Sequence, residues 1–371
     1  MSTFLVPAQS TAIPSDKTDS RIPTLDGWRG VAILLVLFDH FQVSLFGHDV
    51  FPWMQTGQHG VTIFFVLSGF LITSKLTQGP IELKKFYLRR IFRLLPAAWA
   101  FLAIVLLFDR LTGMHATPLS DIRACLLFYR NYYHSPTAVH FAGHFWSLSL
   151  EEQFYLLWPW VLVLAGAGRS KWIAISGAGA CAVYRYLHWS FYANVPFENY
   201  RSQVRADALL VGCLLALLLS DPTFKVKAES YSAMLVVPSF VLLLFCMVRF
   251  HSLPTLIESL AIAALISAST LNPELPVARA LSVAPLAWLG VASYSIYLWQ
   301  QFFIQLGEGP FKAVSLFVAL PAFSLMSYFW IETPCVQLGH RISNSTEKGM
   351  GPASVRRRGD DDLERLASRE A

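Results

Sequence analysis

The sequence predicts an all-α integral membrane protein, a bundle of about ten transmembrane helices with both ends of the chain in the cytoplasm. Three observations predict this class. The 371 residues are 54% hydrophobic and only 14% charged, whereas soluble domains carry about 25% charged residues. Apolar stretches of helix length recur along most of the chain, and lysine and arginine are distributed unequally between the connections.

The apolar stretches define the expected elements. Their spread along the chain favours one polytopic domain over two soluble ones, and the 11 Trp, 13 Tyr and 28 Phe suit aromatic belts at two membrane interfaces. The expected helices span residues 28–46, 58–76, 91–109, 146–165, 171–187, 204–220, 231–249, 255–271, 285–306 and 311–331.

The cations set the expected orientation. With the N-terminus inside, 21 of the 29 Lys and Arg lie on the cytoplasmic side and 8 on the outer side, which is the positive-inside pattern. The chain shows no internal repeat of the kind found in secondary transporters. The net charge of +5 follows from this inner bias, so we expect no nucleic-acid partner.

Both ends of the chain are polar. We expect residues 1–20, rich in Ser, Thr and Pro and without signal-peptide features, to be disordered, and residues 343–371 to form a disordered cytoplasmic tail. The five cysteines are scattered and predict neither disulfides nor a zinc site. His140 and His144 have a metal-like spacing, but no third ligand is evident, so we expect no metal.

The stretch from Arg29 to His40 is the centre of the functional hypothesis. Eleven residues make about three helical turns, so the two side chains share a face roughly 16 Å apart along the axis. With Arg29 at the headgroups, His40 lies near the middle of the membrane, where ionisable groups are costly and usually functional. The alternative is that His40 only hydrogen-bonds a neighbouring helix.

A cationic inner loop opens the third expected helix, with five Lys and Arg between residues 84 and 93. Arg90 and Arg93 share a face of the helix, and Arg89 and Arg93 are also neighbours because they are four residues apart. Stacked guanidinium groups repel one another and suit phosphate oxygens. We therefore expect a phosphate-bearing ligand here; ordinary positive-inside anchoring is the alternative.

Further polar residues allow both structural and functional interpretations. Ser68 and Gly69 allow close approach of a helix or a ligand. Glu151 and Glu152 either favour a helix N-terminus or supply a carboxylate that orients His40, and only one of the two can face it. The remaining candidates for substrate contacts are Tyr155, in the same helix, and Arg205 and Asp207, which either pair with other helices or meet a polar acceptor.

Six short motifs follow one another along the chain: Leu25–Gly30 with His40, Phe64–Ile72, Phe86–Arg90 with Arg93, Phe145–Ser149 with Glu151 and Tyr155, Ser293–Ser295 with Tyr297, and Ile331–Pro334. Together they resemble the bacterial membrane-bound acyltransferase 3 family over residues 21–342. Gln300 is a departure, because many members of that family have histidine after Tyr-Leu-Trp.

The resemblance implies ten helices in a bacterial inner membrane, with both ends of the chain in the cytoplasm. It implies transfer of an acyl group, usually acetyl from acetyl-CoA, to a hydroxyl of a cell-envelope or exported glycan. His40 would be catalytic, with Arg29 beside it at the donor site and Glu151 as an essential carboxylate. Arg90 and Arg93, with Arg89 next to them, would bind the CoA phosphates.

The mechanism expected from these residues is general-base catalysis. A neutral His40, its tautomer held by Glu151, takes the proton of the acceptor hydroxyl; a covalent acyl-histidine is the alternative. Acyl-CoA is thus a co-substrate, no permanent cofactor is expected, and the partners are a glycan or lipid-linked sugar and membrane lipids. The competing functions are a transporter or flippase of an acylated or phosphorylated metabolite and a non-catalytic membrane interaction protein.

Overall fold

The computed structural model describes residues 22–46, 56–114, 117–133, 141–192, 200–249, 255–306 and 310–348. Within these ranges the chain is helical and forms no β-strand. The helices are α1 (Pro23–Phe46), α2 (Thr56–Thr77), α3 (Leu83–Thr112), α4 (Leu119–Leu126), α5 (Phe145–Tyr192), α6 (Ser202–Arg205), α7 (Asp207–Leu219), α8 (Pro222–Arg249), α9 (Thr255–Leu271), α10 (Pro276–Leu281), α11 (Ala284–Gln305), α12 (Pro310–Val314), η2 (Ser315–Ala319), α13 (Leu320–Ser327), η3 (Tyr328–Glu332) and α14 (Thr333–Lys348), where η marks a π-helical turn.

The all-helical prediction is confirmed for the described residues, and each predicted span overlaps a helix. Two predicted spans fall in the two halves of α5, which meet at Gly166 with a φ of 71°, a conformation that glycine adopts without strain. Four helical stretches in the described ranges are long and apolar enough to cross a membrane: Thr56–Thr77, Leu83–Thr112, Pro222–Met247 and Phe311–Ser345. The number of crossings and the side on which each end lies stay predictions.

Two boundaries differ from the predicted ones. Residues 84–90, predicted as a loop, form the beginning of α3, so the cationic side chains there have fixed helical positions. At the other end, helix continues through α14 to Lys348, beyond the predicted start of the tail at 343. The predicted disordered segment 1–20 and the tail after Lys348 lie outside the described residues.

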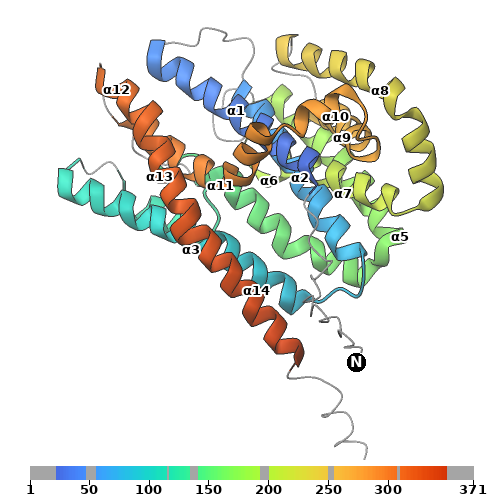
Figure 1. Cartoon of the computed structure of the whole chain (residues 1–371), viewed down its shortest axis with the longest axis horizontal. Coiled ribbons are helices and arrows are strands. Elements are labelled where there is room, and N and C mark those ends of the chain that lie inside the picture. Colours follow the sequence, from blue (N-terminus) through green and yellow to red (C-terminus); the bar gives the residue numbers. More distant parts are fainter. Residues whose placement is uncertain are drawn as a thin grey trace, which may run out of the picture.

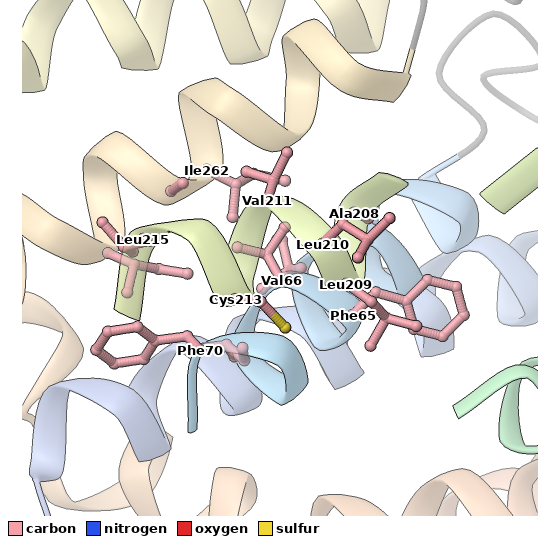
Figure 2. Close-up of a cluster of buried hydrophobic side chains, with 14 of the residues drawn as sticks. Phe65, Val66, Phe70, Ala208, Leu209, Leu210, Val211, Cys213, Leu215 and Ile262 are labelled. Carbon is pink, nitrogen blue, oxygen red and sulfur yellow. The ribbon is translucent and has the colours of Figure 1, made fainter. Parts of the chain in front are cut away.

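The largest apolar core lies where α2 and α7 pack together, and Figure 2 shows Val66, Leu209 and their neighbours at this contact. The backbones touch because each helix has a glycine there. A Cβ added at Gly69 would lie 2.0 Å from the carbonyl oxygen of Leu209, and one at Gly212 would lie 2.0 Å from that of Val66. Close approach through small residues is the usual means by which membrane helices associate, and it confirms the packing interpretation of Gly69.

Helices α1 and α11 form the second close pair, and this pair positions the candidate site. A Cβ at Gly290 of α11 would lie 1.7 Å from the carbonyl oxygen of Asp26 on α1, and one at Gly27 of α1 would lie 1.9 Å from that of Leu281, the last residue of α10, which precedes α11 in the chain. Further along both helices His40 meets Gln300. The contacting residues therefore advance in the same direction along both helices, so α1 and α11 run parallel.

The periphery is formed by long apolar helices. In Figure 1, α3 packs against α14 at one edge of the bundle, while α8 lies at another edge and packs against α9. The outward face of α8 carries exposed apolar side chains, among them Met234, Val237 and Val241. Such a face is what the hydrocarbon of a membrane requires.

Candidate active site

His40 lies on α1 and is hydrogen-bonded to Gln300 of α11. The distance from His40 Nδ1 to Gln300 Oε1 is 2.8 Å, and the Gln300 side chain is completely buried. An amide oxygen can only accept a hydrogen bond, so Nδ1 carries the proton. The other ring nitrogen, Nε2, then has its lone pair available for a proton or an electrophile.

His40 lies in the last third of α1. Because α1 begins at Pro23, Arg29 is already about 9 Å along the helix axis, and His40 is about 26 Å along it. His40 is thus roughly 9 Å from the last residue of the helix, Phe46. The depth of His40 in the membrane stays a prediction.

Arg90 faces α5. Its guanidinium carbon lies 3.2 Å from the centre of the Tyr155 ring, and its Nε is 3.4 Å from Glu152 Oε1. The side chains of Arg90 and Glu152 are both largely buried, 18% and 16% exposed, so the pair is weakly screened by solvent. The sequence argument required an anion to compensate the arginines, and part of that compensation comes from this glutamate of the same chain.

Arg93 lies one turn further along α3 and belongs to the same charged group. It is within electrostatic range of Arg29, Arg90 and Glu332. Glu332 is buried and accepts a hydrogen bond of 2.9 Å from Ser295 Oγ of α11. The structure therefore brings Arg29, Arg90 and Arg93 together as the sequence interpretation required, and adds Glu332 from the π-helical turn η3.

Glu151 has a different partner from the predicted one. Ser68 Oγ of α2 donates a hydrogen bond of 2.6 Å to Glu151 Oε1, and Tyr155 interacts with the same carboxylate. Glu151 is also within electrostatic range of Arg29 and Arg90. The prediction that Glu151 orients His40 is therefore wrong for this structure, because Gln300 occupies the Nδ1 side of the ring. Glu151, Ser68 and Tyr155 instead belong to the arginine cluster.

Arg89 points away from this cluster. Its Nε donates to Ser343 Oγ at 2.9 Å and its terminal nitrogen donates to Asn344 Oδ1 at 2.8 Å, both on α14. Successive residues of a helix are about 100° apart, so Arg89 cannot follow Arg90 toward α5. In this structure Arg89 links α3 to α14 rather than joining Arg90 and Arg93; its role in phosphate binding stays a prediction.

Arg205 and Asp207 pair with other helices and lie near each other. Arg205 hydrogen-bonds Gln58 Oε1 of α2, and the buried Asp207 accepts a 2.6 Å hydrogen bond from Arg185 of α5. These contacts correspond to the first of the two alternatives for this pair, contact with other helices. Their predicted role in acceptor binding stays a prediction.

Sequence reasoning missed three residues of this region. Gln300 was noticed only as a departure from a family pattern, and Glu332 only as part of a motif. His144 was noticed only for its four-residue spacing from His140, which lies outside the described residues. Gln300 and Glu332 follow hydroxyl-rich or apolar residues in apolar helices, and a polar group that cannot reach water there needs a partner. That signal was present, although it identifies no partner. No cluster of three or more metal-ligating side chains occurs among the described residues.

Comparison with known proteins identifies the class of protein. The acyltransferase 3 family model, described as an acyltransferase domain, matches residues 22–332, so the chain belongs to this family. With its long apolar helices it is a multi-pass membrane protein.

Two relatives of the chain are named as peptidoglycan O-acetyltransferases. The chain is 31% identical over 367 residues to the putative peptidoglycan O-acetyltransferase YrhL of Bacillus subtilis, covering 86% of this chain and 56% of YrhL. It is 28% identical over 362 residues to the peptidoglycan O-acetyltransferase OatA of Listeria monocytogenes, covering 84% of this chain and 55% of OatA. The chain thus spans little more than half of these relatives. No solved structure matches it significantly.

Proposed function

We propose that this chain is an integral-membrane O-acetyltransferase of a bacterial plasma membrane. It moves an acetyl group from cytoplasmic acetyl-CoA to a hydroxyl of a cell-envelope glycan, with His40 as the general base. The observation that carries this proposal is the hydrogen bond between His40 Nδ1 and the buried Gln300 amide oxygen, because in a neutral imidazole whose Nδ1 is the donor, Nε2 is the acceptor nitrogen. The family membership supplies the reaction class.

The arginine cluster supports a donor that carries phosphates. Arg90 and Arg93 present planar guanidinium groups that suit phosphate oxygens, and Arg29 links them to the helix that carries His40. The pantetheine arm of the donor then follows α1 from Arg29 to His40, a rise of about 16 Å. Because Arg90 contacts Glu152 in the structure, an incoming phosphate exchanges places with this carboxylate.

The chemical step balances without a further reactant. The acceptor hydroxyl gives its proton to His40 Nε2 while its oxygen bonds to the acyl carbon. The carbon–sulfur bond breaks, and the imidazolium returns the proton to the leaving thiolate. Apolar walls around the site limit access of water and therefore wasteful hydrolysis. Peptidoglycan, the acceptor named for YrhL and OatA, is the first acceptor to test.

The test is acetyl transfer by the purified full chain in detergent, with labelled acetyl-CoA and peptidoglycan fragments. Wild-type protein should form O-acetylated fragments, and His40→Ala should lower turnover by at least about 100-fold, a typical effect of removing a general base, while donor affinity is retained. Label trapped on wild-type protein but absent from His40→Ala would indicate the covalent acyl-histidine route. An intact His40→Ala variant with normal turnover would overturn the assignment of the base.

The acceptor and the donor can also be tested in cells. Mass spectrometry of envelope glycans with and without the gene should reveal lost acetyl groups in the glycan that is the acceptor. Uptake of intact acetyl-CoA into proteoliposomes, without transfer of its acetyl group, would instead support a transporter and contradict this proposal.

A further inference from the structure

His144 is a buried imidazole with no hydrogen-bond partner in the part of the chain that the structure describes. It lies in the turn that precedes α5 and is only 5% exposed. Neither ring nitrogen has a hydrogen-bond partner among the described residues. Buried polar side chains are nearly always hydrogen-bonded, because an unsatisfied group loses its hydration without compensation. His144 therefore needs an explanation that packing alone does not supply.

The surroundings of His144 are aromatic. The rings of Phe101, Phe145 and Tyr297 lie 5.5, 5.1 and 5.3 Å from the His144 ring, measured between centroids. Elsewhere this fold does provide partners for a largely buried histidine, since His59 pairs with Glu258 at 2.8 Å. A neutral imidazole always has one N–H donor and one acceptor nitrogen, so at His144 both functions are available to a ligand.

Helix α11 contacts both His144 and His40. Tyr297 and Gln300 are three residues apart on this helix and therefore share a face. Tyr297 contacts the His144 ring, and Gln300 holds His40. His40 and His144 are accordingly within electrostatic range of each other.

His144, just before the start of α5, is well separated along the chain from the α5 residues that contact the arginine cluster. Arg90 contacts Glu152, eight residues further on and about 12 Å along the helix axis. Nearer to His144, the hydroxyls of Ser147 and Tyr297 lie 2.6 Å apart, and Ser147 donates to the His144 carbonyl oxygen. The groups that contact His144 are thus neutral hydrogen-bonding side chains and aromatic rings, with the buried Arg130 also within electrostatic range. These contacting groups suit an alcohol.

We propose that His144 binds the reacting hydroxyl of the acceptor. Its N–H donates a hydrogen bond to the hydroxyl oxygen while His40 Nε2 takes the hydroxyl proton. This orients an oxygen lone pair toward the acyl carbon; the carbon–oxygen bond forms, the carbon–sulfur bond breaks, and His40 passes the proton to the CoA thiolate. The inference rests on the proposed acetyl transfer and assigns its acceptor subsite.

The experiment compares three kinds of variant of the full chain in detergent. His144→Phe keeps an aromatic ring among aromatic neighbours and removes both nitrogens. His144→Gln and His144→Asn each supply an amide N–H, on side chains of two different lengths. His188→Phe is the matched control, because His188 is also buried, at 7% exposed, and its ring centroid lies 5.9 Å from that of Tyr184 within α5. Acetyl-CoA affinity and acceptor-dependent transfer are measured separately for each.

Loss of a hydrogen bond to a buried group corresponds to a fall of about 10- to 100-fold in kcat/KM for the acceptor. We expect this fall in His144→Phe with unchanged acetyl-CoA affinity, partial recovery in one amide variant, and normal transfer in His188→Phe. Normal transfer by His144→Phe would overturn the proposal, as would loss of donor affinity in folded His144→Phe. Wild-type protein that neither binds acetyl-CoA nor transfers acetyl would instead overturn the proposed function, which is a separate result.

Discussion

At the residue scale, the orientation of the His40 imidazole depends on the amide to which it is hydrogen-bonded. Gln300 Oε1 accepts from Nδ1 at 2.8 Å and comes from a helix 260 residues away in sequence. A carboxylate would also fix the tautomer, but it would place a charge in a buried apolar position, where ionised groups are costly. A neutral amide orients the ring without that cost.

Replacing Gln300 tests this dependence. Gln300→Leu removes the acceptor for Nδ1–H, so the ring loses its fixed tautomer and orientation. We expect kcat for acetyl transfer to fall about 100-fold, as misplacement of a catalytic group does, with little change in KM for acetyl-CoA. Steady-state kinetics measure both constants. Gln300→Glu should retain more activity than Gln300→Leu, and equal loss in both variants would contradict an orienting role.

The two neighbouring arginines at the start of α3 test the donor site. Arg90→Ala removes a guanidinium group that faces α5, and we expect KM for acetyl-CoA to rise about tenfold or more, the effect of losing a charge-assisted hydrogen bond. Arg89→Ala is the matched control, because Arg89 bonds Ser343 and Asn344 on α14. It should leave this KM unchanged. An equal rise in both variants would return Arg89 to the phosphate-binding group.

At the element scale, two glycine-mediated helix pairs determine the arrangement of the site. The α2–α7 contact places Ser68 where it reaches Glu151, and the α1–α11 contact places Gln300 where it reaches His40. Both contacts bring backbones so close that a methyl group would collide with a carbonyl oxygen. The π-helical turn η3 contributes in another way, by ending at the buried Glu332 that contacts Ser295.

A methyl group added at Gly69 should destabilise the bundle. Its Cβ would lie 2.0 Å from a backbone oxygen that cannot move alone, and overpacking of this kind costs about 1–3 kcal/mol or more. Gly69→Ala should therefore lower the unfolding temperature in detergent and reduce activity with it. Gly179→Ala is the control, since no atom lies within 4 Å of its added Cβ. Equal unfolding temperatures for the two variants would contradict the close contact of α2 and α7.

At the scale of the whole molecule, an apolar helical bundle encloses a row of polar groups. The row begins with Arg90, Arg93 and Arg29, with their glutamates, and continues along α1 and α11 to His40 and Gln300. The arginine cluster of the proposed donor site and the proposed acceptor subsite at His144 thus lie at different places in the bundle. Such an arrangement suits a reaction whose two substrates arrive from opposite sides of a membrane.

The orientation of the molecule in the membrane follows from its cations and can be measured. With 21 of 29 Lys and Arg on one predicted side, the positive-inside rule places both ends of the chain in the cytoplasm. A cytoplasmic reporter fused after residue 371 should be active and a periplasmic one inactive. A fusion at residue 115, between α3 and α4, should give the opposite pair of results. Identical results at both positions would contradict the predicted topology.

The sequence by itself determined the properties that depend on neighbouring residues. Composition and periodicity predicted the helices, and the order of six motifs indicated the family. Helical spacing also predicted that Arg90 and Arg93 share a face, because the 3.6-residue period is a local property. The tertiary structure decided which residue faces which across helices. His40 meets Gln300 rather than Glu151, and Arg89 meets α14. His144 comes within electrostatic range of His40 and has no hydrogen-bond partner within the described ranges. These pairings depend on where glycines let backbones approach, and contacts between residues far apart in the chain leave no periodic signal in one sequence.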